Sequence, residues 1–142
     1  MRYINDIIIH CTATPAGREV TRAEIDEWHR ARGWRGIGYH YLIHLDGSIE
    51  RGRAISVPGS HCFGHNAHSI GVAYVGGVNE VGQPADTRTK EQRQSMLQLV
   101  GRLTAMYRCR VHGHRDYAQR DCPCFDAAAE YGGLYNQICR PI

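Results

Sequence analysis

The sequence predicts an α/β single domain in which a mixed central β-sheet carries helices on both faces. Short apolar runs at residues 7–9 and 69–75 have the length and composition of buried strands. Longer segments with apolar residues at helical spacing alternate with these runs. A chain of 142 residues is long enough to bury one core. We therefore expect residues 1–142 to form one domain.

The first part of the chain is predicted to form a strand and then a helix. Residues 7–11 form the buried strand. Thr21, followed three residues later by Glu24, is a capping box that begins a helix, and Gly33 ends it. Three residues of this helix are expected to share one face, namely Ile25, Trp28 and His29.

The middle of the chain is predicted to form a hairpin and another strand. Residues 39–45 and 48–51 flank Asp46 and Gly47, a pair typical of two-residue hairpin turns. The strand at residues 69–75 stops at a pair of glycines.

The last part contains a loop, a long helix and a strand. Residues 78–88 include Gly and Pro and are predicted to form a surface loop, after which Thr89 caps a helix. Its apolar residues recur at helical spacing, namely Met96, Leu97, Val100, Leu103 and Tyr107. A short strand follows at residues 110–112, and Asp126 can cap a final helix, which Gly132 and Gly133 are expected to weaken.

The composition excludes several classes of protein. Seventeen basic and 14 acidic residues give a net charge of only +3, too mild to argue for nucleic acid. The apolar run near the N-terminus is too short for a signal peptide or a membrane span, so we expect a soluble chain made in the cytoplasm. Reduced thiols are then expected, and four of them are interpreted as small buried hydrophobic residues: Cys11, Cys62, Cys109 and Cys139.

A metal site is predicted near the C-terminus, in a stretch too polar to be core. It contains two histidines and two cysteines, namely His112, His114, Cys122 and Cys124. Such a mixed set suits zinc, which binds neutral imidazole nitrogen and thiolate sulfur in tetrahedral geometry. His10 is the best candidate for a third ligand, because it ends the apolar run of a buried strand. Two histidines and one cysteine leave a fourth position for water, the pattern of catalytic zinc sites.

Six segments of the chain resemble one enzyme family, and they occur in the family's order. They are residues 10–14, 36–41, 46–48, 59–61, 66–77 and 114–126. The family is that of the type 2 N-acetylmuramoyl-L-alanine amidases, which includes amidase-type phage lysozymes and peptidoglycan recognition proteins. Because the segments spread over nearly the whole chain, the match is far more specific than any single motif.

The resemblance selects among the candidate residues. It implies one zinc ion per chain, held by His10, His114 and Cys122, and it implies that Tyr39 is catalytic beside the metal. Taken alone, Tyr39 is as well explained as an ordinary hairpin residue, with Tyr41 two positions away on the same face. Arg120 is expected to add catalytic charge, at a position where the phage enzymes carry a lysine.

Four further residues are expected to contact substrate. In the family's register His61 and Asn66 face the cleft, although a glycine-rich loop of this kind is also an ordinary turn. Trp28 and His29 are assigned to substrate binding as well, and the alternative is that they form only the buried face of their helix.

The resemblance implies hydrolysis of the amide between the lactyl group of N-acetylmuramic acid and L-alanine in peptidoglycan. Arg120 departs from the phage pattern, and a guanidinium is a poor general acid, so the proton donor to the leaving amine is unassigned. The candidates are zinc-bound water, Tyr39 and a neighbouring histidine. Two other classes stay open. One is a peptidoglycan-binding module without catalysis, although such relatives typically lack the cysteine. The other is a structural zinc closed by His112 or Cys124 that serves a protein partner.

The biological setting is predicted from the same resemblance. A small amidase without a wall-binding module is similar to a phage or prophage endolysin that a holin releases to the cell wall in the periplasm. A chromosomal recycling enzyme and an exported effector are the alternatives. We expect a monomer whose partner is peptidoglycan, with no nucleic acid and no membrane span.

Overall fold

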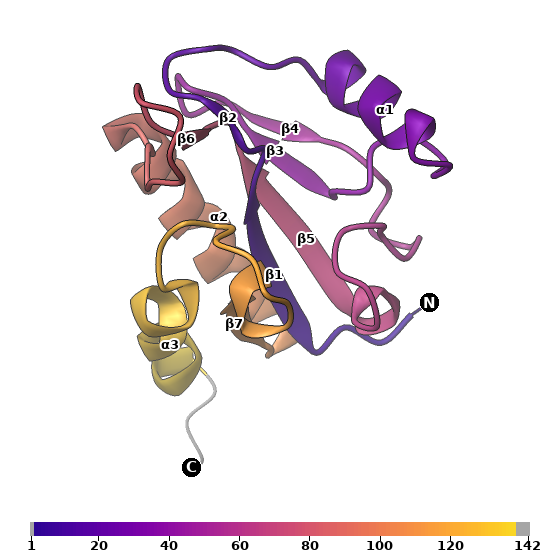
Figure 1. Ribbon diagram of the computed structural model, residues 1–142. Coiled ribbons are helices and arrows are strands. Elements are labelled where there is room, and N and C mark those ends of the chain that lie inside the picture. The colour runs from indigo at the N-terminus through magenta and orange to yellow at the C-terminus, as the bar shows by residue number, and fades with distance from the viewer. Residues whose placement is uncertain (1, 139–142) are drawn as a thin grey trace.

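The computed structural model describes residues 2–138, so Cys139 lies outside the described residues. Its centre is a five-stranded sheet in the order β4-β3-β5-β1-β7 (Figure 1). The strands are β1 (Asp6–Cys11), β3 (Tyr41–Ile43), β4 (Ile49–Arg51), β5 (Ser69–Tyr74) and β7 (Arg110–Gly113). All neighbouring pairs are parallel except β3 with β4, which forms the antiparallel edge. The predicted mixed sheet is confirmed.

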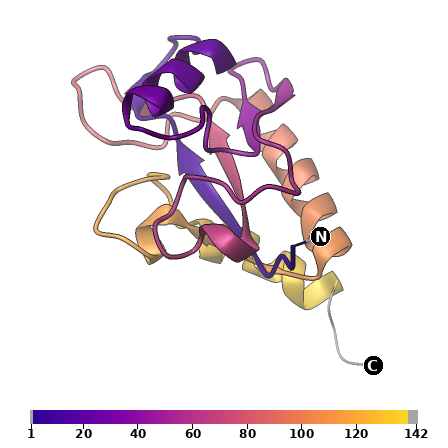
Figure 2. The ribbon, with the colours of Figure 1, turned by 90° about the vertical axis from the view of Figure 1, so that its right-hand side faces the viewer.

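Helices cover both faces of this sheet (Figures 1 and 2). The helices are α1 (Arg22–Ala31), α2 (Lys90–Tyr107) and α3 (Ala127–Ile138). Side chains of α2 and α3 form one core with alternate strand residues such as Ile7 and Ile9. On the opposite face Ile25 of α1 packs with Leu42 and Ala73. Successive strand residues point to opposite faces, so His10, which follows Ile9, lies on the α1 face of the sheet.

The helix starts follow the capping signals in the sequence. The side-chain oxygen of Thr21 accepts the N–H of Glu24 at 3.1 Å, and the Glu24 carboxylate accepts the N–H of Thr21 at 3.0 Å. Thr89 and Gln92 form the same reciprocal pair at the start of α2. Asp126 Oδ1 accepts the N–H of Ala129 at 3.1 Å. These contacts satisfy backbone donors that lack a partner inside the helix.

The hairpin turn differs from its prediction. The His44 N–H donates to the Ser48 carbonyl at 2.9 Å, so the loop has three residues rather than two. Within it the Gly47 N–H donates to the His44 carbonyl at 2.9 Å, and Gly47 has a φ of +87°. This is a turn followed by a left-handed residue, which glycine adopts without steric cost.

Further structure appears outside the predicted strands and helices. β2 (Thr14–Pro15) and β6 (Gly77–Val78) form a small parallel sheet, and 3-10 turns occupy η1 (Asn66–His68) and η2 (His114–Asp116). The predicted surface loop ends on Arg88, which is buried. Its guanidinium pairs with Asp86 at 2.9 Å and with Glu130 of α3 at 2.7 Å, so this end of the loop is fixed to the domain. No helix in the described part of the chain is both long and apolar enough to cross a bilayer.

Candidate active site

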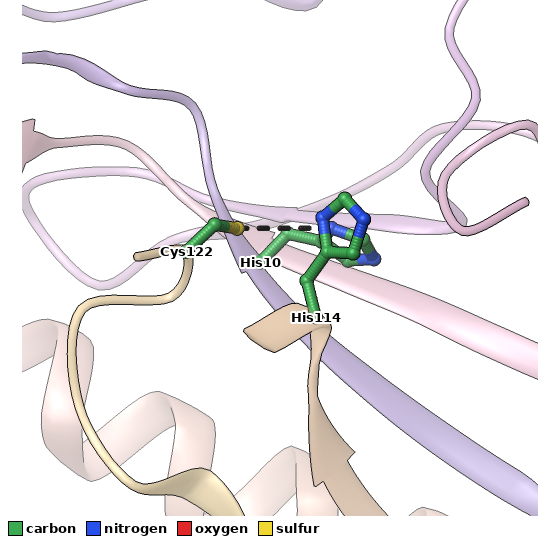
Figure 3. A group of neighbouring side chains, drawn as sticks. All are labelled: His10, His114 and Cys122. Carbon is green, nitrogen blue, oxygen red and sulfur yellow. Dashed lines mark hydrogen bonds between the residues drawn. The ribbon is translucent and has the colours of Figure 1, made fainter. Parts of the chain in front are cut away.

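Three side chains that could hold a metal ion meet at the carboxyl ends of the parallel strands (Figure 3). His10 lies near the end of β1, and His114 begins η2 directly after β7. Because β1 and β7 are parallel neighbours, these histidines reach the same edge of the sheet. Cys122 comes from the loop before α3, where its Sγ accepts the Cys11 N–H at 3.2 Å. One donor atom from each of the three residues lies within 4.8 Å of the others.

The surroundings keep both imidazoles neutral. The His10 side chain is 1% exposed, and burial holds its pKa well below the usual range. Burial, with the charge of Arg120, also lowers the pKa of His114. Neutral imidazole is the form that binds a metal, so these histidines need not lose a proton to do so.

Tyr39 and Arg120 flank the three candidate ligands. The Tyr39 ring centroid is 5.3 Å from that of His10, and burial raises the pKa of its hydroxyl above the ordinary value. The hydroxyl is therefore protonated near neutral pH and can donate a hydrogen bond. Tyr39 precedes β3 rather than belonging to it, and Tyr41 packs into the core on the α2 face, so these two tyrosines do not share a face. Arg120 is exposed at the cleft wall.

The candidate ligands line a cleft of about 480 Å³. Its walls include Tyr39, Arg120, His61 and Asn66, all of which the sequence assigned to the site. His29 lines the cleft too, and its Nδ1 accepts the Gly38 N–H at 2.8 Å. Asn66 Oδ1 accepts the His61 N–H at 3.0 Å, and His61 Nδ1 lies 2.8 Å from His10 Nε2.

The structure does not place Trp28 in the cleft, where it was predicted to contact substrate. Trp28 is absent from the described residues that line the cleft, and the guanidinium of Arg18 lies 5.7 Å from its ring. The reason is helical geometry, since successive residues point about 100° apart and His29 is the one that turns inward.

The rival ligands point elsewhere. His112 Nδ1 lies 2.8 Å from a carboxylate oxygen of Asp6. The Cys124 thiol lies 4.0 Å from the Cys11 sulfur and donates to the Gly77 carbonyl at 3.4 Å. Among the described residues, neither rival joins the group formed by His10, His114 and Cys122. The four-ligand site that a purely structural zinc needs is therefore not formed by these two residues.

Comparisons with known proteins agree on one family. Residues 1–125 match the family described as N-acetylmuramoyl-L-alanine amidase. The chain belongs to this family. It is 40% identical to the endolysin of Klebsiella phage KP32 over 123 residues, which cover 86% of this chain and 82% of that one. It is also 40% identical to the endolysin of Escherichia phage T7 over 121 residues, 84% and 80% of the two chains.

A solved amidase has the same fold. The N-acetylmuramoyl-L-alanine amidase LysC from Clostridium intestinale URNW superposes with a TM-score of 0.79 at 33% identity. The superposition covers 94% of this chain and 86% of LysC. The amidase fold predicted from the sequence is thus confirmed by both sequence and structure.

Sequence reasoning missed several residues of the amidase cleft. Arg32, Phe63 and Tyr117 are among those that line it. Phe63 is 99% exposed, and an apolar side chain next to a glycine in a polar loop was a usable signal. The hydroxyl of Tyr117 donates to Asp6 at the far end of β1, a contact that depends on tertiary structure alone.

We expect the metal-free amidase to lose stability as the pH falls from 7 to 5. Burial lowers the pKa of His29 to about 4 and that of His40 to about 4. Below the unfolded value of about 6.5 the unfolded chain gains protons that the folded chain does not, so unfolding becomes easier. At pH 5 each of these two histidines lowers the free energy of unfolding by about 2 kcal/mol.

His44 acts in the opposite direction. Burial lowers the pKa of His44, but the carboxylates of Glu19 and Glu50 raise it above the usual value. The stability that His44 contributes to the folded state is therefore fully present below about pH 6.5 and is lost as the pH rises. Because the two buried histidines outweigh this one, the net change is a loss. Urea unfolding in a chelator at pH 7 and pH 5 measures it, and an equal free energy of unfolding at both values would contradict the expectation.

Proposed function

We propose that this amidase uses zinc to hydrolyse the amide between N-acetylmuramic acid and the L-alanine that begins the stem peptide. The observation that carries the proposal is the convergence of donor atoms from His10, His114 and Cys122 at the cleft. Two neutral imidazoles and one thiol are ligands that zinc prefers, and three protein ligands are the number in catalytic zinc sites. When bound, zinc supplies a Lewis acid and makes water nucleophilic near neutral pH.

The chain's own groups stabilise the charge that develops on the scissile carbonyl. The Tyr39 hydroxyl keeps its proton because burial raises its pKa, so it can donate a hydrogen bond to the oxyanion. Arg120 adds a fixed positive charge at the cleft wall. The charge also favours binding of the carboxylates that a stem peptide carries.

The proton for the leaving amine is proposed to come from the attacking water. Burial keeps His10 and His61 neutral by holding the pKa of each well below its usual range, so neither carries a spare proton. Arg120 does not release its proton near neutral pH. Hydrolysis adds the hydroxyl of the water to the carbonyl carbon. The other proton of the water goes to the amine nitrogen as the C–N bond breaks.

The setting we propose is that of a phage endolysin, as the named relatives are, with peptidoglycan as the partner. All proposed site residues come from a single chain, which is compatible with a monomer. We further propose that the chain reaches the wall after release by a holin, without binding nucleic acid.

Digestion of purified sacculi tests the reaction. The expected products are stem peptides with a free L-alanine amine and glycan strands with intact lactyl groups, identified by mass spectrometry. A chelator should stop their release and added zinc should restore it. Binding to sacculi without new ends would favour a non-catalytic binding module instead.

Arg120 gives a prediction of its own. Arg120→Ala should lower turnover by roughly tenfold with little change in zinc content, since an exposed charge is partly screened and is not a ligand. Arg120→Lys should retain or raise activity, because lysine keeps the charge. Steady-state kinetics with metal analysis measures both.

Arg115→Ala is the control, an exposed arginine of η2 whose guanidinium donates to the Asp121 carbonyl at 3.1 Å. Rates within a few-fold of the parent for both Arg120 variants would remove Arg120 from the site. A loss with Arg120→Lys as deep as with alanine would replace the electrostatic role with bidentate hydrogen bonding.

A further inference from the structure

We propose that His61 is a positioning residue, whose ring fixes the orientation and the proton of His10 for metal binding. The inference rests on the proposed function, since it assumes that His10 is a ligand. His61 was predicted as a substrate contact. Its geometry points inward instead, toward the back of the His10 ring.

The two nitrogens of His10 face different partners. Nδ1 lies 3.9 Å from Cys122 Sγ, on the side where the candidate ligands meet (Figure 3). Nε2 lies 2.8 Å from His61 Nδ1. A neutral imidazole that binds metal through Nδ1 carries its proton on Nε2, so His10 donates and His61 Nδ1 accepts.

This assignment fixes the proton of His61 as well. With Nδ1 accepting, the proton of the neutral His61 ring is on Nε2, which lies 3.3 Å from the Ser69 hydroxyl oxygen. A chain of hydrogen bonds therefore leads from β5 through His61 to His10.

The protein holds the His61 ring in a fitted position. A Cβ added to Gly71 of β5 would lie 2.6 Å from His61 Cδ2, and one added to Gly59 would lie 2.5 Å from the same atom. Both glycines thus leave space that the His61 imidazole occupies. Asn66 Oδ1 accepts the N–H groups of His61 and Cys62 at 3.0 Å each, which fixes the backbone that carries the ring.

A direct substrate contact explains these facts less well. The His61 side chain is 7% exposed, and both of its ring nitrogens have partners inside the protein. A residue that hydrogen-bonds to the substrate needs a polar atom in the cleft that has no partner inside the protein. His61 has the features of an outer partner of a metal ligand, and loss of such a partner typically costs 10–100-fold in metal affinity.

Two nearly isosteric variants separate positioning from packing. Asn and Leu branch alike at Cγ, but only the Asn side chain has an acceptor oxygen near the place of Nδ1. His61→Leu should weaken zinc binding by roughly 10–100-fold, and His61→Asn should stay within a few-fold of the parent. Competition with a chromophoric chelator measures zinc affinity, and the absorption bands of the Co²⁺ form report on the ligand geometry. His61→Ala replaces the leucine variant if that chain does not fold.

His40→Leu is the matched control. Its ring is also buried, lies 5.8 Å from that of His61, and has Gly71 and Val57 as backbone partners. It should lower the melting temperature of the metal-free protein without changing zinc affinity, because His40 has no contact with His10 among its described hydrogen bonds.

The outcomes separate the two proposals. Tight zinc binding by the parent, with loss in His61→Leu and retention in His61→Asn, supports the positioning role. Equal affinity in parent, His61→Leu and His61→Asn overturns that role and leaves the zinc amidase intact. Equal losses in His61→Leu and His61→Asn also overturn it, since packing then explains both. A parent that binds no zinc at the site overturns the metal-dependent function and this inference together.

Discussion

Cys122→Ser is expected to remove most of the bound zinc and most of the amidase activity. A hydroxyl is a much poorer zinc ligand than a thiolate, so loss of the true ligand costs metal as well as rate. The geometry that motivates this is the approach of Cys122 Sγ to within 3.9 Å of His10 Nδ1. Metal analysis of the purified variant, with release of stem peptides from sacculi, measures both effects.

Cys124→Ser is the matched control, two residues along the same loop. Its thiol donates to the Gly77 carbonyl, and burial, with the nearby Cys11, raises its pKa to about 12. A serine hydroxyl can make the same donation, so zinc content and most activity should remain. If Cys124→Ser proved the damaging change and Cys122→Ser were silent, the assignment of Cys122 as a ligand would be wrong.

The sheet edge that carries His10 and His114 was predictable because His10 ends an apolar strand and His114 follows the short strand predicted at residues 110–112. Parallel strands bring their carboxyl ends to one edge, so two such residues meet there even when a hundred residues separate them. The thiol could not be assigned in this way. Cys122 and Cys124 lie in an irregular loop, and only the resemblance to the amidases chose between them.

The role proposed for His61 could not be predicted from local pattern. It depends on the register that places Gly71 beneath the ring and on a loop that brings His61 back to β1. Nothing in the spacing of residues 59–66 encodes this contact. The resemblance correctly placed His61 at the cleft, but it did not show which way the ring nitrogens face.

Two smaller predictions were wrong in detail although the predicted elements exist. One concerns the side of a helix on which a residue lies, and the other concerns the length of a hairpin loop. The helix predicted from Thr21 exists, yet Trp28 lies at the margin of its buried face, where a rotation of one residue decides exposure. The hairpin predicted around Gly47 exists as well. Its loop is one residue longer than predicted, since the pairing of His44 with Ser48 closes it.

Tyr39→Phe is expected to lower turnover by roughly 10²-fold or more while zinc content and stability stay near those of the parent. The substitution keeps the ring that packs 5.3 Å from the His10 ring and removes only the hydroxyl. One lost donor to an oxyanion costs about that factor in rate. Because the interaction is made in the transition state, kcat should fall with kcat/KM while KM changes little.

Tyr41→Phe is the control for this experiment, since Tyr41 lies two residues further on and packs into the core on the other face of the sheet. It should leave turnover unchanged, so a rate loss confined to position 39 cannot be ascribed to a disturbed hairpin. Unchanged turnover in Tyr39→Phe would return Tyr39 to the role of an ordinary residue before β3. In that case Arg120 would be the one remaining protein group proposed here to stabilise the oxyanion, and the loss in Arg120→Ala should then exceed tenfold.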